Sequence, residues 1–146
     1  MSATGDLESR GGAQAGTTLI EALAVVAITS LVALIGFPRL QQELLTLAQR
    51  QTVCVVAARL RQVRAEAMVG DRPMVFAIGR DGLDFRASDG ASARTPPGVE
   101  LNAARPGVTF YGDGSSSGGS IWVRAGRRSV PVFVAPVTGA VSVGRP

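Results

Sequence analysis

The fold is decided by residues 16–38, which read GTTLIEALAVVAITSLVALIGFP. The sixteen residues from Ala22 to Phe37 carry no charge, and the 21 residues from Thr17 to Phe37, the apolar segment, carry one, Glu21. A helix of that length spans about 31 Å, close to the roughly 30 Å hydrocarbon core of a bilayer. Because the segment is apolar on all sides, it lacks the polar face of a helix that packs on a soluble core. The sequence therefore predicts a membrane-spanning helix.

The surroundings of the apolar segment differ from those of a removable secretory signal. A signal peptide has a basic start, and a small-residue cleavage site follows its apolar run. Here the polar residues 1–16 end in Gly16 directly before the apolar segment, and the chain continues beyond it as Pro38-Arg39-Leu40. We therefore expect the segment to remain in the mature protein.

Glu21 is the one ionisable residue in the apolar segment, and a carboxylate inside a membrane helix is costly unless it is paired. Two interpretations are open. In one, the side chain reaches the headgroup layer and has no partner. In the other, a cut after Gly16 creates an α-amine on Thr17, one helical turn away, and this amine pairs with Glu21 of a neighbouring chain.

The order and spacing of these residues form a motif. Gly16 is followed by TTLIE at residues 17–21, then by an apolar run and Pro38. This motif resembles the class III signal of type IV pilins and type II secretion pseudopilins. In that family a prepilin peptidase cuts after the glycine and methylates the new N-terminus. The glutamate is fifth and a proline twenty-second in the mature chain. The resemblance implies cleavage after Gly16, N-methylation of Thr17, and assembly roles for Glu21 and Pro38.

Two features depart from the usual pattern of that family. The first mature residue is usually phenylalanine and is Thr17 here, and the usually basic leader holds Asp6 and Glu8 beside one arginine. Arg39 and Arg50 follow the apolar segment, so a count of positive charges alone favours the opposite orientation. We give the motif more weight, because cleavage by that peptidase requires a cytoplasmic leader.

A second stretch narrows the family. Residues 110–123 read FYGDGSSSGGSIWV and resemble the F-x-x-D-G-S-x-S-G-G-x-I segment of GspH/FimT-type minor pseudopilins, and residues 60–73 resemble the end of that group's helix. The resemblance covers most of residues 16–143. It implies a minor pseudopilin of a type II secretion system, assembling into the periplasmic pseudopilus that drives export of folded proteins across the outer membrane. The alternative is a FimT-type minor pilin of a type IV pilus, acting in pilus priming or DNA uptake.

The same resemblance implies partners and a location. The partners are other minor and major pseudopilins, the prepilin peptidase, the inner-membrane assembly platform and membrane lipid. The location is the bacterial inner membrane, crossed once, with the C-terminal domain in the periplasm. The resulting parts are a cleaved cytoplasmic leader (1–16), a transmembrane helix (17–38), a periplasmic helical stem (39–69) and a β-rich globular head (70–146).

The stem predicts a helix with one apolar stripe. Its stripe residues recur at spacings of three and four and are Val53, Val56, Leu60, Val63 and Ala67. We expect the stripe to pack on the domain that follows, because the repeat is too short to favour a coiled-coil seam. Gly70 and Pro73 predict the end of the helix, with the glycine as its cap.

Beyond the stem, short apolar runs predict strands near residues 74–78, 83–86, 99–101, 108–110, 121–123, 130–134 and 141–143. Pro131 predicts that its strand lies at a sheet edge, and the polar residues 87–98 predict a mobile loop. The predicted fold class is therefore α+β and pilin-like: a long N-terminal transmembrane helix whose C-terminal half packs on a small antiparallel sheet domain, as one or two sheets.

The composition excludes several kinds of site. The 146 residues suffice for one modest domain, and they include no histidine and a single cysteine, Cys54, which we expect to be a buried small hydrophobe. Histidine triads, histidine metal sites, zinc clusters and an internal disulfide are therefore excluded. We expect no enzyme activity and no cofactor.

Other residue patterns carry weaker signals. Residues 112–119 lack the Lys-Ser/Thr of a P-loop and predict a surface hairpin loop, while the serines at 115–117 have no base to activate them. The spacing of four aspartates in the head matches no calcium loop; these are Asp81, Asp84, Asp89 and Asp113.

Positive charge in the chain comes from arginine alone. Fifteen arginines face eleven acids, for a net charge of +4, and Arg127-Arg128 is the one adjacent pair. Such a surface attracts DNA without sequence preference. Some FimT-like relatives use arginines of a C-terminal tail in DNA uptake, but residues 138–143 have none. We therefore favour solvated surface charge over nucleic-acid binding.

Overall fold

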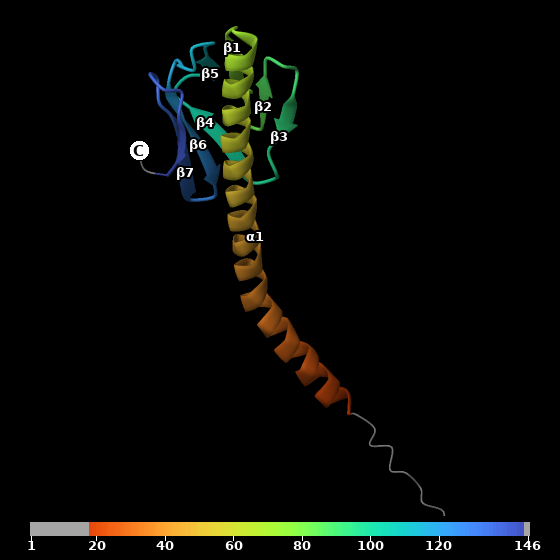
Figure 1. The fold of residues 1–146 in the computed structure, drawn as a ribbon. Coiled ribbons are helices and arrows are strands. Elements are labelled where there is room, and N and C mark those ends of the chain that lie inside the picture. The colour runs from red at the N-terminus through yellow and green to blue at the C-terminus, as the bar shows by residue number, and fades with distance from the viewer. Residues whose placement is uncertain (1–17, 145–146) are drawn as a thin grey trace, which may run out of the picture. The chain divides into compact units, whose positions relative to one another are not determined.

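The structure, a computed structural model, describes residues 18–144 (Figure 1). The positions predicted for cleavage and methylation, Gly16 and Thr17, lie outside these residues, as does the leader. The elements in chain order are α1 (Leu19–Gly70), β1 (Met74–Ile78), β2 (Asp84–Ala87), β3 (Ser92–Arg94), β4 (Val99–Ala103), β5 (Gly107–Phe110), β6 (Gly119–Ala125), β7 (Arg128–Val134) and β8 (Val141–Val143).

The chain divides into two compact units, one ending at Pro38 and the other beginning at Arg39. Helix α1 therefore contributes a first half (residues 19–38) to one unit and a second half (residues 39–70) to the other. None of the side chains in the first half is buried. It is long and apolar enough to cross a membrane.

The second unit contains two four-stranded antiparallel sheets. The first sheet has the strand order β3-β2-β1-β5, and the second has the order β4-β6-β7-β8. The longest pairing joins β6 to β7, from Gly119 opposite Val134 to Ala125 opposite Arg128. Because β5 and β6 belong to different sheets, the segment between them connects the sheets rather than two strands of a hairpin.

One hydrophobic core joins the second half of α1 to both sheets, and Figure 1 shows that half lying across them. The five stripe residues predicted from the sequence are all at most 5% exposed, which confirms the stripe. In the first sheet the rings of Phe76 and Phe85 stack with centroids 5.2 Å apart. The strands supply other large buried side chains, namely Met74, Val99, Leu101, Val108, Phe110, Ile121, Val123, Val132 and Val134. The predicted α+β architecture is confirmed, with two sheets.

The helix ends one step later than the sequence predicted. Gly70 is still helical, and Asp71 takes the left-handed conformation with φ 42°. The Arg72 N–H then donates to the Ala67 carbonyl at 3.2 Å, which closes the last turn. Aspartate tolerates this conformation because its short polar side chain bonds locally.

Two predictions about the strands are wrong. Residues 87–98, predicted as a mobile loop, contain β3, which pairs with β2 from Asp84 opposite Arg94. The β7 strand that contains Pro131 lies between β6 and β8 rather than at an edge. The proline fits because its nitrogen and carbonyl point toward the β8 side, where the carbonyl accepts from Gly144 N at 2.9 Å, beyond the last β8 residue.

Candidate assembly surface

Two hydroxyl side chains in the first half of α1 bond to the backbone of the same helix. The Thr29 hydroxyl donates to the Val25 and Val26 carbonyls at 2.9 and 3.0 Å, and the Ser30 hydroxyl donates to Val26 at 2.7 Å. A hydroxyl bonded in this way needs no water, so the surface is suited to an apolar surrounding such as lipid or other helices.

Glu21 lies in the first turn of α1, where an acid also interacts favourably with the helix dipole. Its N–H donates to the Thr18 hydroxyl at 3.3 Å, so Thr18 caps the helix in the Thr-x-x-Glu pattern of a capping box. The Glu21 side chain is exposed. The pairing predicted between Glu21 and the amine of Thr17 stays a prediction, because Thr17 lies outside the described residues.

Pro38 lies inside the continuous helix α1 and is exposed. Its missing N–H leaves the carbonyl four residues earlier, on Leu34, without the usual helical donor. This missing helical hydrogen bond lies near the point at which the chain divides into its two units. An assembly role for Pro38 stays a prediction.

The second half of α1 presents an uncharged strip of exposed residues on the side away from the core. We call this strip the stem seam, and its residues are Leu40, Leu44, Leu47, Gln51, Cys54, Ala58, Gln62 and Ala65. The spacings are all three or four residues, as in the seam of a packed helix pair. Each of the three leucines is more than half exposed. The seam therefore exposes large apolar side chains next to one another, as a surface that packs against a partner does.

The prediction of a buried Cys54 is wrong, because the thiol-bearing side chain is exposed on the stem seam. Cys54 lies two residues from both Thr52 and Val56, which are buried. Two residues correspond to about 200° around a helix, so Cys54 points away from the core. Its apolar neighbours in the sequence belong to two different faces.

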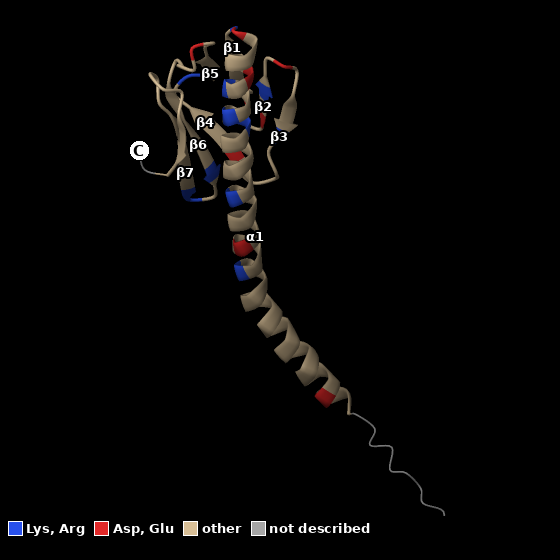
Figure 2. Cartoon of the chain, viewed as in Figure 1, with Lys and Arg blue, Asp and Glu red and all other residues tan. Residues whose placement is uncertain are grey.

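Charged residues follow one border of the stem seam. They are Arg39, Glu43, Arg50 and Arg61, and Figure 2 shows charges of both signs along this part of α1. The first half of α1 carries one charged residue, Glu21. Bordering charges of this kind set register and partner choice when helices pack side by side.

The segment that resembles the GspH/FimT motif is a structural connector between the sheets. The Asp113 carboxylate accepts from the Ser115 N–H at 2.9 Å and from the Ser115 hydroxyl at 2.6 Å. The Ser116 hydroxyl donates to the Ala135 carbonyl at 3.0 Å, and the Ser117 hydroxyl accepts from Thr109 N at 3.1 Å. All three hydroxyls thus serve the fold. The segment turns back on the end of β5, where Phe110 and Ser116 form an antiparallel bridge, as the predicted hairpin loop requires, and it then continues into β6 of the other sheet.

One glycine of this connector is required by its backbone. Gly118 has φ 65°, and a Cβ built on it would lie 3.0 Å from Cβ of Pro136. Any other residue is therefore disfavoured at this position, because its Cβ would crowd Pro136 and would be strained at this φ.

The aspartates of the head stabilise turns rather than gather into a site. Asp81, Asp89 and Asp113 each accept a hydrogen bond from the N–H two residues later. The pKa of Asp89 is lowered by the Ala91 N–H and by the Arg59 guanidinium, and the pKa of Asp113 is lowered by the Ser115 hydroxyl and N–H. Among residues 18–144, no three His, Cys, Asp or Glu side chains lie close enough to hold a metal ion.

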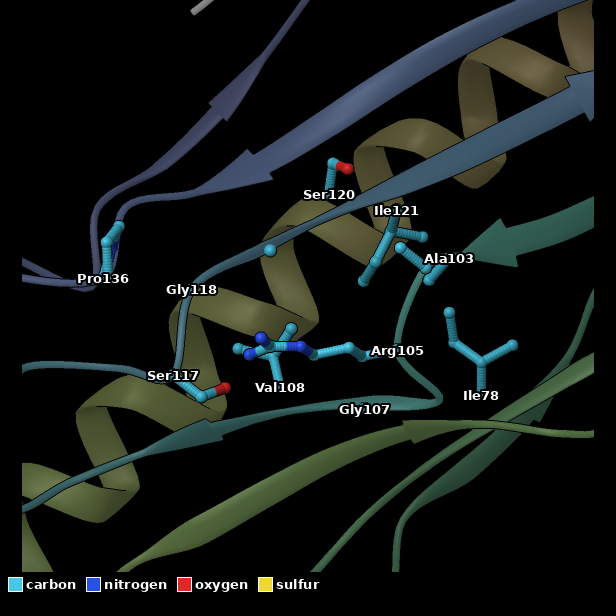
Figure 3. Close-up of a pocket in the computed structure, with 12 residues that line it drawn as sticks. Ile78, Ala103, Arg105, Gly107, Val108, Ser117, Gly118, Ser120, Ile121 and Pro136 are labelled. Carbon is cyan, nitrogen blue, oxygen red and sulfur yellow. The ribbon is translucent and has the colours of Figure 1, made fainter.

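A cavity of about 300 Å³ opens between the two sheets, and Figure 3 shows its lining. Its walls include Ile78, Val108, Ile121 and Pro136, and Arg105 extends across it as its one ionisable side chain. Its other polar side chains are the hydroxyls of Ser117 and Ser120, and its lining residues include no histidine or acid.

The sequence and the fold can be compared with those of known proteins. No protein-family model matches the sequence, and no curated protein matches it. Among solved structures, the type IV minor pilin FimU of Pseudomonas aeruginosa (strain PAO1) aligns with a TM-score of 0.56 and 11% identity over 66% of this chain and 92% of FimU. The chain has the pilin-like fold.

Two further alignments agree with this fold. The minor pseudopilin EpsH of the type 2 secretion system of Vibrio cholerae aligns with a TM-score of 0.56 and 11% identity over 66% of this chain and 95% of EpsH. A second crystal form of FimU aligns with a TM-score of 0.55 and 12% identity over 72% of this chain and 91% of that chain. One neighbour comes from a pilus and the other from a secretion system.

One structural residue was missed by the sequence reasoning. Gln49 is buried, and its side-chain amide donates to the Val123 and Arg128 carbonyls at 2.9 and 3.1 Å. It lies four residues before Val53, so it continues the apolar stripe by one turn. The periodicity alone marks this position as inward-facing, and a polar residue at such a position indicates a buried hydrogen bond.

Proposed function

We propose that this protein is a minor pseudopilin of a type II secretion system, anchored in the bacterial inner membrane and assembled into the periplasmic pseudopilus that drives export of folded proteins. The exposed apolar surface of α1 carries the proposal. It includes the whole first half and the stem seam, although the second half of α1 and both sheets already share one core. That surface is suited to lipid before assembly and to sister helices afterwards.

The mechanism is mechanical. The apolar segment moves from the bilayer into a bundle of equivalent helices from other minor and major pseudopilins. Helix association in an apolar medium depends on close packing and on pairing of polar groups, so Glu21 fixes the register by pairing with the amine of a neighbour's Thr17. Prepilin peptidase cuts after Gly16 and methylates Thr17, and the inner-membrane platform inserts the mature chain into the filament. The head acts through contacts and not through catalysis.

The test of this proposal replaces Glu21 by alanine in the full chain. We expect Glu21→Ala to insert into the membrane like the wild type but to lose co-assembly with the other pseudopilins, because the buried polar pair is gone. Insertion is measured by carbonate extraction, and co-assembly by cross-linking and secretion in cells. Normal secretion with the variant contradicts the proposal.

A second measurement examines the processing step. The mature polypeptide is expected to begin at a methylated Thr17, as read by mass spectrometry. A Gly16→Leu variant is the matched control, because it changes the cut site without altering α1. It is expected to keep its leader and to remain unassembled.

A type IV pilus minor pilin is the second candidate, favoured by the equal structural similarity to FimU and EpsH. Residues 138–143, which lack arginine, favour the secretion system. Duplex DNA binding by the purified protein, falling steeply as salt is raised, reverses the preference. A deletion strain that loses the pseudopilus but keeps normal pili supports the assignment to the secretion system.

A further inference from the structure

The end of the head formed by the β6–β7 hairpin carries a group of arginines. Ala125 and Arg128 face each other as the last pair of the hairpin, and Gly126 and Arg127 form its turn. Gly126 has φ 55°, which suits a tight turn. Arg127 and Arg128 are both exposed.

Buried hydrogen bonds hold this hairpin against the second half of α1. The amide of Gln49 bonds to carbonyls on both hairpin strands, at Val123 and Arg128. A groove of about 350 Å³ between the hairpin turn and α1 is lined by Gln42, Glu43, Leu45, Thr46, Arg127 and Arg128, among others. The turn therefore lies beside Gln42, three residues and about 4.5 Å of helix beyond Arg39.

This end of the head has a net charge of +2, from Arg39, Arg127 and Arg128 against Glu43. None of these three arginines takes part in an ion pair within residues 18–144. Arg124, on the same hairpin, is already paired with Glu100 at 2.6 Å and adds no free charge. The group, which we call the basic end, thus offers uncompensated guanidinium groups.

The position of the basic end along the chain indicates its partner. Arg39 directly follows the last residue of the first half of α1, so it enters the headgroup layer when the apolar segment spans a bilayer. Arginines at that level attract anionic lipids within about one Debye length, on the order of 8 Å. Guanidinium groups also bond phosphate oxygens in pairs.

We propose that the basic end binds the phosphate groups of anionic phospholipids in the membrane that holds the apolar segment. The inference rests on the membrane insertion contained in the proposed function. Such binding holds the hairpin end of the head at the bilayer surface before assembly, and the contact breaks when the chain leaves the membrane. Gln49 acts as a positioning residue, because it fixes the hairpin to α1.

The experiment uses the full chain reconstituted in nanodiscs of phosphatidylcholine alone or of phosphatidylcholine with phosphatidylglycerol. Backbone hydrogen exchange is measured at residues 125–129. We expect exchange there to slow in the phosphatidylglycerol discs by about fivefold for each arginine that reaches the headgroups. Raising the salt concentration is expected to remove the difference, because the attraction is electrostatic.

Matched variants separate a local effect from a general charge effect. Arg127→Gln is expected to reduce the slowing, whereas Arg105→Gln is expected to leave it unchanged. Arg105 follows β4 beyond Ala103, whose partner Ile121 lies toward the opposite end of β6 from the hairpin turn. Equal exchange in both kinds of disc, or an equal effect of the two variants, overturns the inference.

Two further outcomes are distinct. Duplex DNA can be added to the phosphatidylcholine discs. If it slows exchange in the hairpin as much as phosphatidylglycerol does, the choice of a lipid partner is overturned. A chain that carbonate extracts from membranes contradicts the proposed function itself, whereas a chain that inserts but shows no lipid dependence contradicts only the present inference.

Discussion

The two halves of α1 are parts of one helix, yet only the second half belongs to a core. In the first half apolar residues occupy every side, and none is buried within the chain. In the second half apolar residues recur every three or four positions, and that stripe is almost completely excluded from solvent. Periodicity, and not total apolar content, therefore decides whether a helix packs on its own chain.

The largest expected effect comes from truncating the core stripe. Leu60→Ala removes a side chain with no exposed surface, so the head is expected to lose about 2–5 kcal/mol of unfolding free energy. The measurement is urea unfolding of the full chain in detergent, followed by fluorescence of Trp122, the only tryptophan, which lies on β6. Leu31→Ala, in the first half of α1, is the matched control and is expected to leave this transition unchanged.

The stem seam sharpens the same comparison within one half of the helix. Leu47→Ala truncates an exposed leucine, so a change within about 0.5 kcal/mol is expected for unfolding of the head. A loss comparable to that of Leu60→Ala contradicts the division between the stripe and the seam.

An effect between those of Leu60→Ala and Leu47→Ala is expected at the hydrogen bonds of Gln49. Gln49→Leu keeps the size of the side chain but leaves the Val123 and Arg128 carbonyls without their donor, at an expected cost of about 1–3 kcal/mol. The same urea transition measures the loss. Gln51→Leu, on the exposed seam two residues away, is the control, and an equal change in both variants contradicts the role assigned to Gln49.

The last prediction concerns the stability of the head at low pH. The folded pKa values of Asp89 and Asp113 lie below the ordinary value of 3.8, so the unfolded chain binds protons first as the pH falls. Their contribution is complete above pH 3.8 and is lost as the pH drops through the folded pKa values. The urea midpoint is therefore expected to fall in that range. The double variant Asp89→Asn/Asp113→Asn is expected to show a smaller fall, and an unchanged fall contradicts the assignment.

The parts of the fold that depend on local periodicity were predictable from the sequence. The stripe from Val53 to Ala67, the apolar segment and most strands follow from spacing alone. The position of β7 was not predictable, because Pro131 excludes only the hydrogen bond on one side of its strand. Cys54 was misplaced because its neighbours belong to two helix faces.

The candidate surface was predictable only in part. Glu21 and Pro38 were identified through a motif, whereas the stem seam became visible once burial showed which residues of α1 the head leaves uncovered. The hairpin that carries Arg127 was predicted as two strands, but its attachment to α1 depends on the partners of Gln49, which are more than seventy residues away in the sequence. Such long-range pairs leave no local pattern.

The first buried residue of the described chain is Gln49, and every side chain of residues 19–38 is exposed, so the first half of α1 contributes nothing to the interior of the head. The free energy that keeps the head folded is therefore independent of the solvent around residues 19–38. A subunit built in this way can exchange a lipid environment for a protein environment at one end while the other end keeps its shape. In the assembly proposed above, the subunit can therefore be moved from one environment to the other without refolding its core.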